Sequence, residues 1–153
     1  MAEKEKAVSI PMRVGDAGHF AKTVSEADVY LFAGISGDTN RAHLNEEYMK
    51  RTPAGHRVAH GALTLSIASA AQTDLLNRRM DELEAAGLSY LSVGYDHVRF
   101  LAPVYFGDTL TATCEVVEID AARSRTIEEL TAFNQDGVQV LAARHIHHYG
   151  RKE

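Results

Sequence analysis

Asp38 and His43 are the two side chains of this sequence best suited to moving protons. They stand five residues apart in the polar segment 36–44 (SGDTNRAHL), which also contains Asn40. A carboxylate and an imidazole that flank one water molecule can take a proton from it and deliver a proton to a neighbouring atom. The spacing permits the two side chains to converge but does not require it. On their own, an aspartate and a histidine in such a loop are more often turn and capping residues.

Metal binding is a second chemistry open to the same pair, because both residue types are metal ligands. No third and fourth ligand stands at a recognisable spacing from them, so we expect no metal site here. A further histidine tract, His145, His147 and His148, lies near the C-terminal end, with its first two members on one face of a strand. Such a tract is typical of an exposed strand face, which can also bind nickel or zinc adventitiously, and we assign it no role.

The composition is that of a globular protein and predicts one domain over residues 1–153. The chain has 45% hydrophobic and 24% charged residues, and its 153 residues leave no room for two full catalytic domains. With 16 basic against 21 acidic residues the net charge is −5. No overall basic field therefore exists to attract nucleic acid or an anionic membrane.

The chain carries no membrane or secretion signal that we recognise. Its longest stretch without Asp, Glu, Lys or Arg is 58–73, which is 16 residues and falls short of the roughly 18 that a membrane span needs. The charged N-terminal segment is not followed by an apolar run. Cys114, the single cysteine, excludes an intramolecular disulfide and lies in the apolar row of its strand, which favours a buried structural thiol. We expect a protein of the cytoplasm.

Helical periodicity dominates before Gly87. Ser25 is the expected cap of a helix over 26–35, the segment 36–44 is a loop, and Asn45 is the expected cap of a short helix through 46–48. A longer helix is predicted from Gly61 to residue 86. Its first turns are apolar nearly all round, as expected of a helix enclosed by other structure.

Strand-like alternation dominates after Gly87. Strands are predicted over 91–96, 110–116, 126–134 and 138–148, with a tight turn at Asp136-Gly137 joining the last two. An antiparallel sheet that curls around the apolar helix would cover it. The predicted fold class is therefore α+β with a hotdog arrangement, in which an antiparallel sheet wraps a long central helix.

Three sequence blocks carry a family resemblance. They read FAGISGDTNRAHLNEEY at 32–48, VAHGAL at 58–63 and VRFLAPVYFGDTLTA at 98–112. Together they resemble the MaoC-like hydratases, which include the R-specific enoyl-CoA hydratases, from about residue 24 to residue 112. Two positions depart from the family pattern: Arg41 stands where proline is usual, and Met49 where a small residue is common.

The resemblance implies reversible syn hydration of a trans-2-enoyl-CoA to the (R)-3-hydroxyacyl-CoA, a reaction of fatty acid metabolism. Asp38 and His43 would be the catalytic pair, and Asn40 would place the water or the pair. The main-chain N–H of Gly61 would bind the thioester oxygen, and Ser69 would support the site from the central helix. A coenzyme A thioester is the substrate, and no metal or redox cofactor is implied.

Gly61 also suits this chemistry on physical grounds. Hydration moves negative charge onto the thioester oxygen, and the first N–H groups of a helix are free to stabilise it. Four arginines near these segments could meet coenzyme A phosphates, although a solvent-facing arginine is at least as good an interpretation of each: Arg41, Arg51, Arg57 and Arg99.

Three other functions stay open at this stage. The chain could be a 3-hydroxyacyl-carrier-protein dehydratase, a non-catalytic acyl-thioester-binding hotdog protein, or a thioesterase. The acyl group itself is not determined. The free edge of a single sheet predicts a homodimer or a dimer of dimers.

Overall fold

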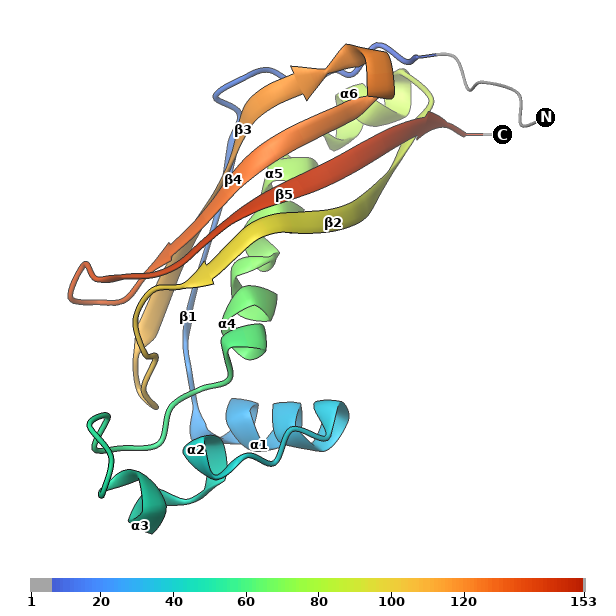
Figure 1. The fold of residues 1–153 in the computed structure, drawn as a ribbon. Coiled ribbons are helices and arrows are strands. Elements are labelled where there is room, and N and C mark those ends of the chain that lie inside the picture. The colour runs from blue at the N-terminus through green and yellow to red at the C-terminus, as the bar shows by residue number, and fades with distance from the viewer. Residues whose placement is uncertain (1–6, 153) are drawn as a thin grey trace.

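Within residues 7–152, which the computed structural model describes, five strands form one antiparallel sheet in the order β1-β3-β4-β5-β2 (Figure 1). The strands are β1 (Ala17–Thr23), β2 (Leu88–Phe100), β3 (Thr109–Asp120), β4 (Arg125–Phe133) and β5 (Gln139–Arg151). Each of the last four overlaps a predicted strand. β1 and β2 are the two edge strands.

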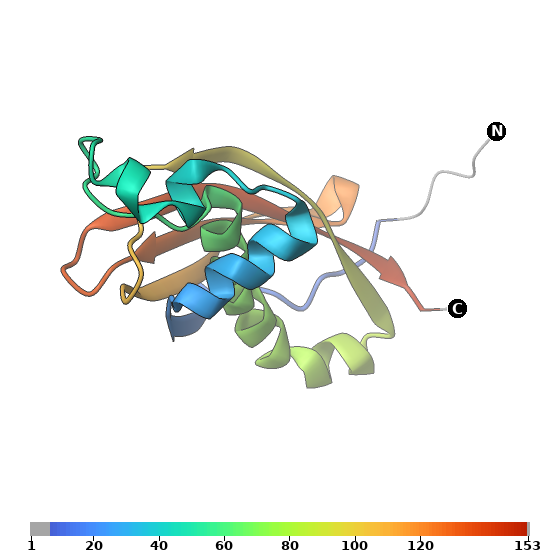
Figure 2. The same ribbon diagram turned by 90° about the horizontal axis from the view of Figure 1, so that it is seen from below.

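The helices are divided between the face of the sheet and one end of the molecule. They are α1 (Glu26–Ser36), α2 (Arg41–Leu44), α3 (Glu46–Met49), α4 (Gly61–Ala68), α5 (Ala70–Asn77) and α6 (Met80–Ala85). α4 and α5 run along the sheet, whereas α1, α2 and α3 gather beyond the N-terminal end of α4 (Figures 1 and 2). The predicted α+β hotdog arrangement is confirmed. In the described part of the chain, no helix is long and apolar enough to cross a membrane.

Local capping explains where the helices beside the site begin and end. Ser25 and Asp28 form a reciprocal capping box at the start of α1, and Gly37 ends that helix with φ 75°. The side-chain oxygen of Asn45 accepts a hydrogen bond from the Tyr48 N–H at the start of α3. Both predicted caps are confirmed. The predicted 36–44 loop also contains the single turn of α2.

The core lies between the sheet and α4–α5. Alternate residues of β3, among them Leu110, Cys114 and Val116, are almost fully buried, as are Leu75 and Ala71 of α5. Each large aliphatic side chain buried in this way contributes about 1.5–3 kcal/mol. Cys114 is buried as predicted, and its burial, reinforced by the charge of Glu128, raises the pKa of its thiol.

The central helix differs from the prediction of one helix over 61–86. The structure divides it into α4, α5 and α6, with breaks at Ser69 and at Arg78–Arg79. At the second break Arg79 leaves helical geometry with φ −118° and ψ 9°. A continuous apolar stripe does not reveal such breaks, because the side chains keep facing the sheet on both sides of them.

β1 was not predicted, because its sequence AGHFAKT has only a weak apolar alternation. Its contact with α5 depends on Gly18 instead. A Cβ atom at Gly18 would lie 2.2 Å from the backbone nitrogen of Leu75, so only glycine allows β1 to approach this helix.

The interpretation of the histidine tract as an exposed strand face is wrong for two of its members. His145 is 0% exposed and His147 is 3% exposed. β5 continues to Arg151, so both residues lie well inside the strand rather than at a frayed end. They face inward on the same side of the strand as the core residues Leu141 and Ala143.

Candidate active site

Asp38 is held in the short connection between α1 and α2. Its N–H donates to the hydroxyl oxygen of Ser36, which itself donates to the Phe32 carbonyl at the end of α1. The carboxylate oxygen Oδ1 accepts from the Asn40 N–H at 3.2 Å. These bonds fix the backbone around Asp38 while its side chain stays 53% exposed.

His43 lies on α2 and is fixed from the opposite side. Asn40 caps α2 through a hydrogen bond from the Ala42 N–H to its side-chain oxygen, at 2.9 Å. The Nδ1 atom of His43 lies 2.7 Å from the Val58 carbonyl oxygen. A carbonyl oxygen only accepts, so Nδ1 carries a hydrogen. In the neutral ring the lone pair is therefore on Nε2.

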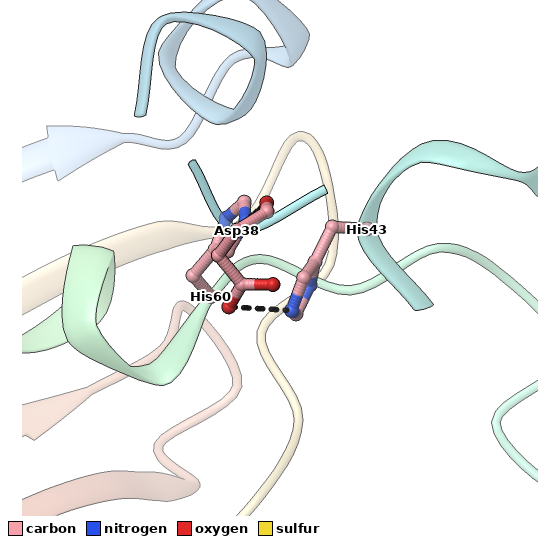
Figure 3. Close-up of side chains that lie close together, drawn as sticks. All are labelled: Asp38, His43 and His60. Carbon is pink, nitrogen blue, oxygen red and sulfur yellow. Dashed lines mark hydrogen bonds and ion pairs between the residues drawn. The ribbon is translucent and has the colours of Figure 1, made fainter. Parts of the chain in front are cut away.

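The structure brings Asp38 and His43 together, which their spacing permitted but did not require. Nε2 of His43 lies 3.9 Å from Oδ2 of Asp38 (Figure 3). This separation is too long for a direct hydrogen bond but is short enough for one water molecule to contact both atoms. The lone pair of His43 and the carboxylate therefore face a common point.

His60, which sequence reasoning did not assign to the site, is its third member. It is 2% exposed and stands at the N-cap position of α4, where its side chain makes no capping bond. Its Nε2 donates instead to the main-chain oxygen of Asp38 at 2.9 Å. Its ring stacks on that of His43, with centroids 3.7 Å apart and planes at 29°. The signal was its position directly before Gly61 in VAHGAL, where we gave Gly61 a role but gave His60 none.

A mostly apolar cavity of about 390 Å³ opens beside this cluster. It lies between the start of α4 and the end of β2, and its lining includes His43, Gly61, Thr64, Phe100 and Val140. A volume of this size is typical of a small-molecule site.

Gly61 presents its main chain to this cavity. As the first residue of α4 it has no acceptor within the helix for its N–H. A Cβ atom at this position would lie 2.6 Å from the ring of Phe100, so a side chain here would have to displace that ring. Gly61, the predicted start of this helix, therefore lines the cavity.

The other two predicted site residues are placed differently. The side-chain oxygen of Asn40 is occupied by the cap of α2, so this residue positions His43 through the backbone. Ser69 is eight residues beyond Gly61, roughly 12 Å along the helix axis. Its hydroxyl donates to the Ser66 carbonyl, and the described contacts do not bring it to the cluster.

Among the arginines, Arg57 serves the structure. Its guanidinium pairs with Glu26 and Glu46 and lies 4.7 Å from the centre of the Phe106 ring. Because Glu26 is on α1 and Glu46 is on α3, these ion pairs hold both helices against the segment that precedes α4.

The stacked rings of the cluster do not suit a metal ion. The ligand atoms of Asp38, His43 and His60 lie within 4.8 Å of one another, so the third ligand that the sequence did not show is present. Imidazole lone pairs lie in the ring plane, however, and two rings stacked at 3.7 Å direct them side by side rather than to one point. One nitrogen of each ring also donates a hydrogen bond to a carbonyl oxygen, so that nitrogen has no lone pair for a metal ion.

Comparisons with known proteins agree with the sequence blocks. Residues 12–137 match the family described as MaoC like domain. The (R)-specific enoyl-CoA hydratase of Rhodospirillum rubrum is 43% identical over 105 residues, which are 69% of this chain and 66% of that protein. The (R)-specific enoyl-CoA hydratase of Aeromonas caviae is 30% identical over 128 residues, 82% of this chain and 87% of that protein.

A solved structure shares the fold. The unliganded R-hydratase of Pseudomonas aeruginosa superimposes with a TM-score of 0.71 at 30% identity, covering 92% of this chain and 84% of that one. The chain spans 66% of the length of the Rhodospirillum relative, just under two thirds. The names of these relatives are those of hydro-lyases.

Proposed function

Because this chain belongs to the MaoC-like dehydratase family, we propose that it catalyses the reversible syn addition of water to a trans-2-enoyl-CoA, which gives the (R)-3-hydroxyacyl-CoA. The observation that carries the proposal is the 3.9 Å separation of His43 Nε2 and Asp38 Oδ2 beside an apolar cavity. The hydratase names of relatives at 43% and 30% identity support it.

The fixed hydrogen on His43 Nδ1 suggests how the protons move. Neutral His43 takes a proton from the water at Nε2 while the water oxygen bonds to C3 and the C2–C3 double bond opens. The same Nε2 then gives its proton to C2. Asp38 accepts the second hydrogen of the water and orients it. Since oxygen and hydrogen arrive from one side of the substrate, the addition is syn.

The charge that develops on the thioester oxygen needs a donor, and we propose the main-chain N–H of Gly61 as that donor. Gly61 is the first residue of α4, at the positive end of the helix, and it lines the cavity. A preorganised donor of this kind is worth roughly 3 kcal/mol in the transition state. The proposed reaction uses this amide to stabilise the charge that a metal ion could otherwise stabilise, and it needs no redox cofactor because the addition of water involves no net redox change.

The test is a hydration assay with trans-2-enoyl thioesters of coenzyme A and of carrier protein, followed by loss of the conjugated absorbance. We expect turnover of the coenzyme A substrate, and His43→Gln should lower kcat by roughly 10²- to 10⁴-fold without unfolding the protein. His56→Gln is a matched control, because His56 also pairs with a carboxylate, Glu46, at 2.8 Å but lies outside the site.

Each other outcome has a distinct meaning. Unchanged turnover in His43→Gln would refute the assignment of the pair. Release of free thiol without hydration would show a thioesterase, and binding of the substrate with neither reaction would show a non-catalytic binding protein. Preference for the carrier-protein substrate would identify a carrier-protein dehydratase.

We also propose that the chain forms a homodimer through β2. This edge strand and the residues after it expose large apolar side chains, namely Leu91, Val93, Phe100 and Leu101. Phe100 and Leu101 also line the cavity, so a second copy here would help to close it. Light scattering should give twice the chain mass, and Leu91→Glu should shift it toward the monomer. A fully active monomer would contradict the proposal.

A further inference from the structure

Glu128, His145 and His147 form a second cluster of titratable groups, away from the proposed active site. Glu128 is on β4 and the two histidines are on β5, and all three are buried on the inner face of the sheet. His145 Nδ1 lies 2.8 Å from Glu128 Oε2, and His147 Nδ1 lies 3.2 Å from Glu128 Oε1. The hydratase proposal gives this cluster no task.

The cluster holds negative charge in the core. Burial alone would raise the pKa of Glu128, but hydrogen bonds from His145, His147 and Thr126 outweigh it and hold this pKa below the ordinary value. Burial lowers the pKa of His145, and the neighbouring His147 adds to the effect. A carboxylate that is 0% exposed is costly unless positive charge accompanies it.

The directions of the ligand atoms suit a cation. The two imidazole rings meet edge to face, at 84° with centroids 4.2 Å apart, and both direct Nδ1 to the same carboxylate. Ligands bonded to a tetrahedral zinc ion at about 2.0–2.1 Å lie roughly 3.3 Å from one another. The observed separations of 2.8 and 3.2 Å each lie within about 0.5 Å of this value, and all three ligand atoms lie within 4.8 Å of one another.

Outer contacts of the kind found around metal ligands are also present. Ser92 Oγ lies 2.7 Å from His145 Nε2, where it can accept the hydrogen that this nitrogen carries when Nδ1 binds a metal. Thr126 donates its hydroxyl to Glu128 and lies 3.2 Å from the hydroxyl of Tyr149. These contacts fix the orientation of the carboxylate and of one ring.

We propose that Glu128, His145 and His147 bind a divalent cation of the zinc class. Two imidazoles and one carboxylate are a donor set that such ions prefer. On binding, the hydrogens that the two Nδ1 atoms donate to Glu128 leave those nitrogens, either for Nε2 of the same ring or for solvent. This proposal does not depend on the hydratase activity.

The experiment is a titration of the full chain, freed of metal with a chelator and desalted, with Zn²⁺ by calorimetry and with Co²⁺ by visible absorption. We expect one cation per chain and, for Glu128→Gln, an affinity at least roughly 100-fold lower. His148→Gln is the matched control, because it removes a histidine of the same tract on the opposite strand face. Its affinity should equal that of the unmodified chain.

Two results would overturn the proposal. One is the lack of any stoichiometric binding to the unmodified chain. The other is binding that His148→Gln abolishes and Glu128→Gln retains, which would place the cation on surface histidines. Should Glu128→Gln fail to fold, nitrogen-15 spectra of the unmodified protein decide the matter, since Zn²⁺ must shift the Nδ1 signals of His145 and His147.

Discussion

Two clusters in this chain use the same side-chain types, one carboxylate and two imidazoles, in opposite surroundings. Asp38 is 53% exposed and His43 is 14% exposed beside a cavity, whereas Glu128 and His145 are 0% exposed in the core. The rings stack at 29° in the first cluster and meet at 84° in the second. The residue types therefore do not determine what each cluster does.

The difference comes from what accepts the imidazole hydrogens. In the cluster beside the cavity, the main-chain carbonyls of Val58 and Asp38 accept these hydrogens. A lone pair of His43 therefore stays directed at a separate carboxylate. In the buried cluster the carboxylate of Glu128 takes both hydrogens itself. The first arrangement leaves a proton acceptor ready for substrate, and the second holds the protons or exchanges them for a cation.

The largest effect that separates the clusters is expected from Asp38→Asn. The amide keeps the size of the side chain but loses the charge that orients the water, so kcat should fall by roughly 10²- to 10⁴-fold. Because the side chain is half exposed, the free energy of unfolding should change by less than about 0.5 kcal/mol. Steady-state kinetics and thermal melting of the same preparation check both. A large loss of stability would show that Asp38 is structural as well.

Glu128→Gln should give the reverse pattern in the metal-free protein. The variant leaves at least one buried imidazole N–H without its anionic acceptor, which costs about 1–3 kcal/mol. The melting temperature should fall by several degrees while kcat stays within twofold. An equal or higher melting temperature would mean that the desolvation of the carboxylate outweighs its hydrogen bonds. A large drop in kcat would show that the buried cluster affects catalysis at the proposed active site.

Much of the fold could be predicted because local signals agree with the tertiary structure. Contacts between residues close in sequence determine three predicted features: the capping box at Ser25 and Asp28, the cap at Asn45 and the turn at Asp136-Gly137. β1 could not be predicted in this way. Its place depends on Gly18 contacting α5, a residue pair distant in sequence, and alternation carries no sign of it.

The site was predictable where its residues share one loop. Asp38 and His43 converge, which their spacing permitted, and Gly61 begins a helix as predicted. His60 was missed because its task is to contact the Asp38 backbone, which no spacing reveals. The interpretation of His145 and His147 was wrong because the burial of these two side chains depends on the length of β5 and on Glu128 of the neighbouring strand β4.

His60→Phe tests whether stacking alone positions the active pair. Phenylalanine keeps a ring against His43 but loses the N–H that donates to the Asp38 carbonyl, so kcat should fall about tenfold while KM stays within twofold. His60→Gln, which restores an N–H donor, should recover part of the loss. Steady-state kinetics of both variants measure this effect, and their melting temperatures control for a loss of stability. A change in KM or stability alone would assign His60 a structural role only.

The smallest effect is expected from pH acting on the buried cluster. The folded-state pKa of Glu128 lies below its ordinary value of 4.5, so the unfolded chain binds the proton more readily. The stability contributed by ionised Glu128 is therefore fully present above about pH 4.5 and is lost as the pH falls through the lower folded-state pKa. The stability difference between the unmodified chain and Glu128→Gln should shrink as the pH falls below about 4.5. Denaturant unfolding of both proteins at pH 7, 5 and 3.5 measures this stability difference. The other carboxylates titrate alike in both chains and cancel in the comparison. A stability difference that is larger at pH 3.5 than at pH 5 would contradict the charge assigned to Glu128.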